Sequence, residues 1–244
     1  MENNNLIKIL LIRFSTFFLT KNRRSKTIFY HDIHSLKKYT SMSTDIILFK
    51  KHIDIIRKNG YEIVPKITKP YNQIEILFDD GFNGIYDNME ILINLNIPIS
   101  LFIVPSYLDN YNYLSTDKLI EISSFSNINI GSHTLNHRIL NEISDDEIFY
   151  ELSESKKQLE KMLNYKITSL VFPEGKFNNK VTEIARNLGY LDIYSSIPGY
   201  YYDEFNHGVK KRSLVQFAKE KEFYDIIRGG DHVLKIWYKY KHYY

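Results

Sequence analysis

The sequence contains no cysteine among its 244 residues, and this absence removes several kinds of chemistry. Disulfide bonds, thiolate nucleophiles and cysteine-based zinc sites are excluded, so any metal site must use histidine and carboxylate ligands. The absence says nothing about compartment, because a chain without thiols is compatible with either redox environment.

A strong charge imbalance and long apolar runs are also lacking. The net charge of +3 is too small to indicate a nucleic-acid-binding protein. Residues 6–19 are apolar but contain Lys8 and Arg13, so this stretch is too short and too charged to span a bilayer. It also lacks the small-residue cleavage site of a secretory signal. We therefore expect a cytoplasmic or peripheral membrane location.

Residues 1–25 are predicted to form an amphipathic helix or extension. A basic run from Lys21 to Lys26 follows the apolar stretch, a pattern that fits a helix lying on a membrane surface. A helix docked on the rest of the protein explains the same pattern, because both arrangements bury the same residues. Residues 26–230 are predicted to form one domain, since repeats and Pro/Gly-rich linkers are absent, and residues 231–244 a basic, aromatic tail.

Segments with strand-like and helix-like patterns alternate along the chain. Strands are expected at residues 26–30, 74–78, 97–104, 128–130, 169–172, 191–195 and 212–215. Helices are expected at residues 44–59, 85–95, 116–123, 144–163, 179–188 and 219–228. Thr44 is the expected cap of the first helix, and Ser144 with Glu147 forms a capping box on the fourth. This alternation predicts an α/β fold with a mostly parallel sheet, open or closed into a barrel.

Three polar motifs directly follow predicted strands, at residues 79–81, 131–137 and 173–175. The C-terminal ends of parallel strands in a barrel gather at one mouth, where chemistry is normally placed. Each motif alone has a simpler explanation: an Asp-Gly turn, two surface histidines and a Pro-x-Gly turn.

Together the motifs indicate a catalytic metal. Asp80, His133 and His137 provide one carboxylate and two imidazoles, a ligand set that leaves positions open for water and substrate. The two histidines are four residues apart and are expected on one face of a helical turn. Asp79 points away from Asp80 on an extended chain, so it is left to act as a general base beside the ion.

The order and spacing of these motifs resemble the polysaccharide deacetylases, carbohydrate esterase family four (the NodB homology domain). That family has Thr/Ser-Phe-Asp-Asp-Gly, His-Ser/Thr-x-x-His and Arg-x-Pro-Tyr-Gly. Here the motifs read Leu-Phe-Asp-Asp-Gly, His-Thr-Leu-Asn-His and Val-Phe-Pro-Glu-Gly. Tyr30-His31-Asp32 and Gly60-Tyr61 are similar to the branch acting on poly-N-acetylglucosamine-type polymers. The resemblance covers residues 28–215 and implies a distorted (β/α) barrel.

The resemblance implies a metal-dependent hydrolase that removes N-acetyl or similar acyl groups from an amino-sugar polymer or glycan precursor. It implies a divalent ion at Asp80, His133 and His137, expected to be zinc, with cobalt, nickel or iron as alternatives. Asp79 is the implied base. The expected substrate is an N-acetylated glycan or a lipid-linked sugar, and Phe172 and Pro173 are expected to contact it.

Three departures from the family pattern affect the other site residues. Val171 replaces the arginine that orients the base, and Arg212, after a later strand, is expected to contact Asp79 instead. Glu174 replaces the motif tyrosine; its backbone N–H is still the expected oxyanion donor, although its carboxylate is poorly placed beside developing negative charge. The family's late Leu-x-His, which supplies the general acid, has no clear counterpart. His207 or His232 is the candidate by residue type.

Other functions fit parts of this pattern. The altered third motif favours a non-catalytic carbohydrate-binding relative, whereas the intact Asp79 disfavours it. An amide hydrolase, a deacetylase or deformylase acting on a lipid-linked sugar or small substrate, fits the lack of a signal peptide. An iron oxygenase with two histidines and one carboxylate is disfavoured by the strand-end Asp-Asp-Gly with a distant histidine pair.

Overall fold

Parallel strands form the centre of the computed structural model, which describes residues 2–18, 23–203 and 208–243. The main sheet has the order β10, β9, β8, β7, β6, β5, β1, β11, with β4 beside β5, and its pairings are parallel. Its strands are β1 (Lys26–Tyr30), β4 (Glu62–Ile63), β5 (Gln73–Phe78), β6 (Ile99–Ile103), β7 (Ile128–Ser132), β8 (Ser169–Val171), β9 (Asp192–Tyr194), β10 (Val209–Lys210) and β11 (Arg212–Leu214). Separately, β2 (Asp32–His34) pairs with β3 (Ser43–Asp45).

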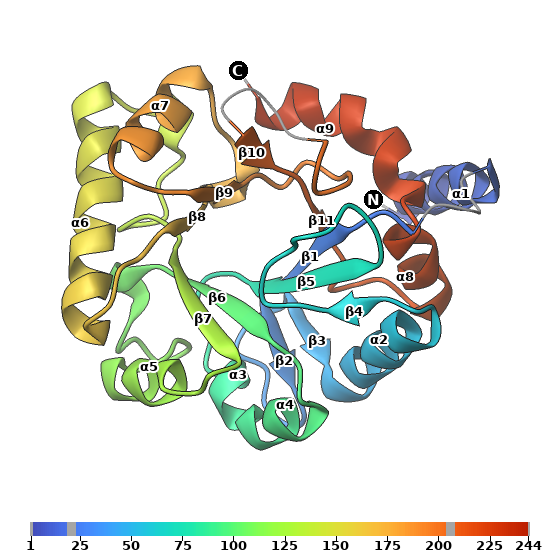
Figure 1. Cartoon of the computed structure of the whole chain (residues 1–244), viewed down its shortest axis with the longest axis horizontal. Coiled ribbons are helices and arrows are strands. Elements are labelled where there is room, and N and C mark those ends of the chain that lie inside the picture. The colour runs from blue at the N-terminus through green and yellow to red at the C-terminus, as the bar shows by residue number, and fades with distance from the viewer. Residues whose placement is uncertain (1, 19–22, 204–207, 244) are drawn as a thin grey trace.

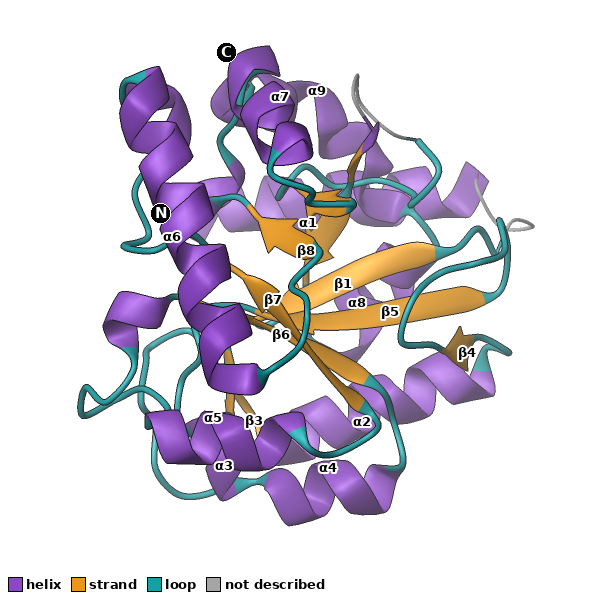
Figure 2. Ribbon diagram, turned by 60° about the vertical axis from the view of Figure 1, so that its left-hand side comes forward, coloured by secondary structure: helices purple, strands orange, loops and turns teal. Residues whose placement is uncertain are grey.

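Helices surround the strands (Figure 1), and the turned view of Figure 2 shows the central strands between α6 and α2. The helices are α1 (Glu2–Phe18), α2 (Ile46–Lys58), α3 (Gly84–Asp87), α4 (Met89–Leu95), α5 (Thr116–Ser123), α6 (Asp145–Leu163), α7 (Asn179–Asn187), α8 (Glu220–Ile227) and α9 (Lys235–His242). Short 3-10 helices are η1 (Pro105–Tyr107), η2 (Leu140–Glu142), η3 (Pro173–Gly175) and η5 (Gly230–Leu234). The predicted α/β fold with a mostly parallel sheet is confirmed.

The two faces of the strands bury different side chains. In β5, Ile74, Ile76 and Phe78 join the large apolar core under the helices, whereas Leu77 joins a second cluster. The members of that cluster are Phe29, Val64, Ile67, Leu77, Phe102, Val171, Tyr194 and Tyr201. Because its strand residues come from β1, β5, β6, β8 and β9, which span most of the sheet, the sheet curls around a shared interior. Inward-facing residues at the strand ends therefore project into one mouth.

A glycine makes room for the aromatic filling of this interior. Gly131 lies in β7 beside Phe102 of β6. A Cβ on Gly131 would lie 2.4 Å from the Phe102 ring, well inside normal contact distance. The ring of Phe102 meets that of Tyr194 edge to face, with centroids 5.8 Å apart. The absent side chain thus lets two large rings pack beneath the mouth.

The predicted elements are present, with differences at their ends. The capping box of Ser144 opens α6 as expected. Helix α2 begins later than predicted, because Asp45 accepts from the N–H groups of Ile47 and Leu48, and Thr44 belongs to β3 instead. The helix predicted at residues 85–95 is divided into α3 and α4 at Asn88, whose φ of −112° is not helical.

The two ends of the chain pack together. Helix α1 contacts η5 and α8, so the N-terminal segment is docked on the domain along one side. Residues 231–244, predicted as a tail, contain most of η5 and the whole of α9. Among the residues that the structure describes, no helix is both long and apolar enough to cross a membrane.

Candidate active site and metal centre

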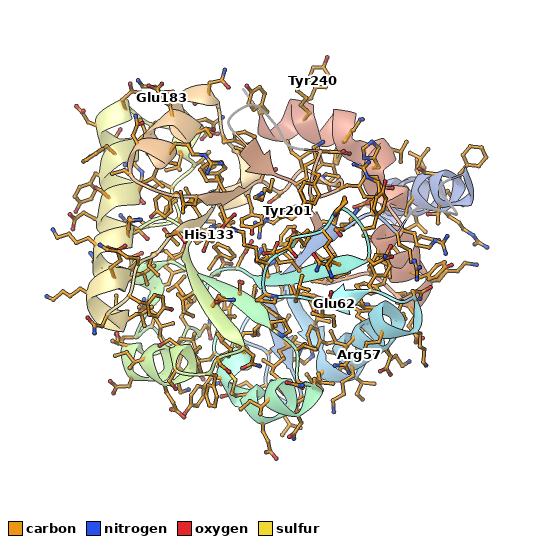
Figure 3. All side chains as sticks on the ribbon, in the orientation of Figure 1. Arg57, Glu62, His133, Glu183, Tyr201 and Tyr240 are labelled. Atoms are coloured by element: carbon orange, nitrogen blue, oxygen red, sulfur yellow. The ribbon has the colours of Figure 1, made fainter. Side chains whose placement is uncertain are left out.

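Loops at the C-terminal ends of β5, β7 and β8 carry the three sequence motifs. Asp79 and Asp80 directly follow β5, His133 follows β7, and η3 lies just beyond β8. Strands β5 to β8 are successive neighbours in the sheet, so parallel pairing brings these loops to the same end. Figure 3 shows His133 well inside the ring of helices, whereas Glu183 and Tyr240 lie at its outer rim.

Asp80, His133 and His137 come together as a candidate metal centre. Their ligand atoms all lie within 4.8 Å of one another, and Asp80 Oδ1 is 3.4 Å from His133 Nε2 and 3.5 Å from His137 Nε2. Ligands of a tetrahedral ion with bonds of about 2.0–2.1 Å lie about 3.3 Å apart, so these spacings fit one ion. Asp80 Oδ1 is buried and has no hydrogen-bond partner within the described chain. A cation would satisfy such an atom.

A backbone contact orients the imidazole of His133, and burial and neighbouring charges shift the pKa values of the three candidate ligands. His133 Nδ1 donates to the Val171 carbonyl over 2.9 Å, which leaves Nε2 to face Asp80. Burial lowers the pKa of His133, but the carboxylates of Asp80 and Asp79 raise it above its ordinary value. Burial raises the pKa of Asp80, and the neighbouring His133 outweighs this to bring it to about 2. Burial and the charge of His133 lower the pKa of His137.

The two histidines do not lie on a helical turn, contrary to the prediction from their spacing. Residues 133–137 form an irregular loop in which Thr134 and His137 have φ values of 65° and 58°. Helix α6 holds this loop through Glu151, which accepts from the Asn136 backbone N–H over 2.8 Å and from its side-chain amide over 2.7 Å. Glu151 is only 1% exposed. A buried carboxylate therefore supplies the hydrogen bonds that a helical turn would have made internally.

The turn of η3 is similarly constrained. Glu174 has a φ of 53° and Gly175 a φ of 69°, and a Cβ on Gly175 would lie 2.5 Å from the backbone nitrogen of Ser196. Non-glycine residues in such conformations are held there by their surroundings, commonly at functional sites. The Glu174 carboxylate is 3.3 Å from Lys176 Nζ, and its side chain is 54% exposed. This contact offsets the negative charge that Glu174 adds to the turn.

Arg212 contacts Asp79 through two charge-assisted hydrogen bonds. Its Nη1 and Nη2 donate to Oδ1 and Oδ2, each over 2.7 Å. The guanidinium lies over the Phe29 ring, 3.9 Å from the centroid, and Nε donates to the Ser195 carbonyl over 2.9 Å. Burial raises the pKa of Asp79, but Arg212, followed by His133, holds it below its ordinary value. Asp79 is therefore an ionised carboxylate of fixed orientation beside the candidate metal centre.

The structure places neither of the two histidines expected as the general acid at this mouth. His207 lies outside the described residues. His232 lies in η5, and its neighbour Asp231 pairs with Lys26, the first residue of β1. This contact places η5 near the N-terminal ends of the strands, away from Asp79, and contradicts the prediction for His232.

Comparison with known proteins decides the family. The model of the polysaccharide deacetylase family matches residues 66–193, which is more than half of the chain. The chain belongs to the polysaccharide deacetylase family. It is 25% identical, in an alignment 177 residues long that covers 68% of this chain, to the Bacillus subtilis (strain 168) protein named "Putative polysaccharide deacetylase YxkH". The match spans 63% of that relative's length.

Solved structures share the fold of this deacetylase family member. Streptococcus pyogenes deacetylase PplD, in complex with acetate, matches with a TM-score of 0.72 and 17% identity, over 85% of this chain and 99% of PplD. BC0361, a polysaccharide deacetylase from Bacillus cereus, matches with a TM-score of 0.73 and 20% identity, over 84% of this chain and 69% of BC0361. IcaB from Ammonifex degensii matches with a TM-score of 0.72 and 16% identity, over 84% of this chain and 97% of IcaB. At these identities the likeness shows the fold.

The structure brings a further histidine, His31, to the mouth of this deacetylase domain. It directly follows β1, the neighbour of β5, and its Nδ1 donates to Gln216 Oε1 over 2.6 Å. Against the raising effect of burial, His31 is among the groups that lower the pKa values of Asp79 and Asp80. The signal in the sequence is position, because His31 follows a predicted strand just as the three motifs do.

Phe172 is not placed to contact a substrate at the mouth. It is fully buried in the outer core, and its ring stacks on Phe177 with centroids 5.2 Å apart. Alternation along the strand turns Val171 inward and Phe172 outward, which corrects the prediction for Phe172. Pro173 is buried in η3, and its contact with substrate stays a prediction.

Partly exposed aromatic rings lie beside the metal centre instead. Tyr107 of η1 stacks near His137, with ring centroids 6.0 Å apart, and lies 4.7 Å from Tyr113. The buried Phe82 stacks on Tyr113 with ring centroids 4.6 Å apart. Burial, followed by the charge of Asp80, raises the pKa of Tyr107 and brings that of Tyr113 to about 12. Local sequence patterns did not single out these rings, because they come from two separate stretches of the chain, the loop after β5 and the segment from η1 onward.

Proposed function

We propose that the chain is a metal-dependent hydrolase that removes N-acetyl or similar acyl groups from amino sugars of a glycan. One observation carries this proposal: the candidate metal centre and the ionised Asp79, held by Arg212, lie side by side at one mouth. Membership of the polysaccharide deacetylase family supports the same reaction. A non-catalytic carbohydrate-binding protein would have no use for a positioned base at this point.

Asp80, His133 and His137 would hold the ion. Two imidazoles and one carboxylate suit zinc, and cobalt, nickel and iron are other ions that this donor set accepts. A bound divalent ion would polarise the amide oxygen and lower the pKa of a coordinated water to about 7.

Asp79 would accept the proton of the attacking water. Its carboxylate is kept ionised and correctly oriented by Arg212, which acts as a positioning residue. A positioned general base typically contributes a factor of about 10²–10⁴ to the rate. The backbone N–H of Glu174 would donate to the developing oxyanion.

His31 would protonate the leaving amine. Gln216 accepts the hydrogen on Nδ1, so Nε2 is the nitrogen left for proton transfer. The amphipathic rings of Tyr107 and Tyr113 would stack on sugar faces beside the metal centre. The proposed substrate is accordingly an N-acetylated glycan. A lipid-linked N-acetylated sugar is the alternative substrate, and the assay below includes both.

Acetate release by the full chain tests this function. Purified protein is stripped of metal, assayed with N-acetylglucosamine oligomers and lipid-linked sugars, and assayed again with added zinc, cobalt, nickel or iron. We expect zinc to restore activity, and Asp79→Asn to keep zinc binding while losing about 10²–10⁴-fold in rate. Asp54→Asn, at an exposed position of α2, is the matched control and should behave as wild type. Unchanged turnover in Asp79→Asn would assign the base elsewhere. If the protein bound zinc but released acetate from none of these substrates, the proposed hydrolase function would be wrong.

A further inference from the structure

Over residues 7–16, the part of the helix whose side chains the structure describes, α1 is held on the domain by one side. Ile12 and Thr16 face the body of the protein and are 1% and 6% exposed. The contact is close, because a Cβ on Gly230 of η5 would lie 2.2 Å from Thr16 Oγ1 and 2.5 Å from the Ile12 carbonyl oxygen. This side of the helix is therefore occupied by its contact with η5.

The outer side of α1 exposes apolar side chains. Ile7, Leu10, Leu11 and Phe14 are 57%, 55%, 44% and 69% exposed, and together with Arg13 they line a shallow surface hollow. Their spacing of three, four and seven residues puts them on one helical face. We call this set the outer face of α1. Helix α1 lies at the edge of the molecule opposite α6 (Figure 1). A contiguous apolar set of this kind marks an interaction surface.

Basic side chains lie near this face. Lys8 is half-buried, and Arg13, Lys235 and Lys239 are exposed, whereas Lys26 is buried in a pair with Asp231 and Arg24 pairs with Asp203. Helix α1 packs on η5 and η5 contacts α9, so Lys8, Arg13, Lys235 and Lys239 belong to neighbouring elements. We call these four residues the basic pole; Glu222 and Asp225 of α8 also lie near Lys8 and Arg13.

We propose that the outer face of α1 docks on an anionic lipid surface. The apolar side chains would enter the interfacial region while Arg13 and the neighbouring bases meet lipid phosphates. A second copy of the chain is disfavoured as the occupant, because pairing through this face would bring two basic poles together. The proposal concerns where the protein binds and does not depend on its catalytic activity.

Vesicle flotation of the full chain tests the proposal. At low salt, wild-type protein should float with vesicles of phosphatidylcholine and phosphatidylglycerol and stay in solution with phosphatidylcholine alone. Added salt should release it, because about 0.1 M salt screens charges beyond roughly 10 Å. Arg13→Gln should weaken partitioning about fivefold.

Replacement of the apolar side chains separates docking from simple charge attraction. The double variant Leu10→Gln and Phe14→Gln should partition at least about tenfold more weakly. Phe149→Gln, at a 53% exposed position on α6, is the matched control and should float as wild type. Wild-type thermal unfolding and zinc binding in the double variant show that its fold is intact.

Three results would overturn the proposal. Wild-type protein could remain in solution with anionic vesicles at low salt. The folded double variant could float as well as wild type. Sedimentation could show a wild-type dimer that the double variant abolishes, which would assign the outer face of α1 to a second copy.

Discussion

Removing one partner of the ion pair between Arg212 and Asp79 tests how much this buried pair contributes to the stability of the protein. Arg212→Met keeps much of the side-chain volume but removes both 2.7 Å hydrogen bonds to the Asp79 carboxylate. The two side chains are 1% and 3% exposed, so water cannot take over these bonds. Removing one partner of a buried ion pair costs about 3–5 kcal/mol, because the other charge stays buried without compensation.

Urea unfolding of metal-free protein measures this effect. Arg212→Met and Asp79→Asn should each lower the free energy of unfolding by about 3–5 kcal/mol. The double variant carries neither charge, so its loss should fall short of the sum of the single losses by about 2–3 kcal/mol.

A matched cycle provides the control. Lys51 and Glu220 are 2.6 Å apart but 51% and 53% exposed, and their coupling should be only about 0.2–1 kcal/mol. A coupling between Arg212 and Asp79 as small as this would refute the argument that burial makes the pair important.

Two further predictions concern the interior of the sheet. Burial raises the pKa of Glu75 to about 7, against hydrogen bonds from Thr27 and Tyr194 that lower it, so the folded state binds this proton more tightly than the unfolded state. As pH rises from about 4.5 to about 7, the free energy of unfolding should fall by up to about 3 kcal/mol relative to Glu75→Gln; parallel pH profiles would contradict this. Gly131→Ala should cost about 1–3 kcal/mol, because its Cβ would lie 2.4 Å from the Phe102 ring. Adding Phe102→Leu should recover most of that loss in thermal unfolding, and no recovery would locate the strain elsewhere.

Local sequence patterns predicted the parallel sheet, and they predicted that the candidate metal ligands lie together at one mouth of it. The apolar run before Asp79 forms β5, and the capping box of Ser144 opens α6, because both features depend on neighbours in the chain. Local patterns gave a wrong local structure where hydrogen bonds from a distant residue determine the backbone conformation. Spacing predicted a helical turn at residues 133–137, but buried Glu151 of α6 satisfies that loop from outside.

The sequence by itself determined which residues follow the strands, and so the candidate ligands Asp80, His133 and His137. Only the tertiary structure decided their partners and directions. Gln216 holds His31 across 185 positions of the chain, and Phe172 turns into the outer core one residue after an inward-facing valine. The physical reason is that a hydrogen bond or a packed ring depends on which segments lie side by side, and strand periodicity does not contain that information.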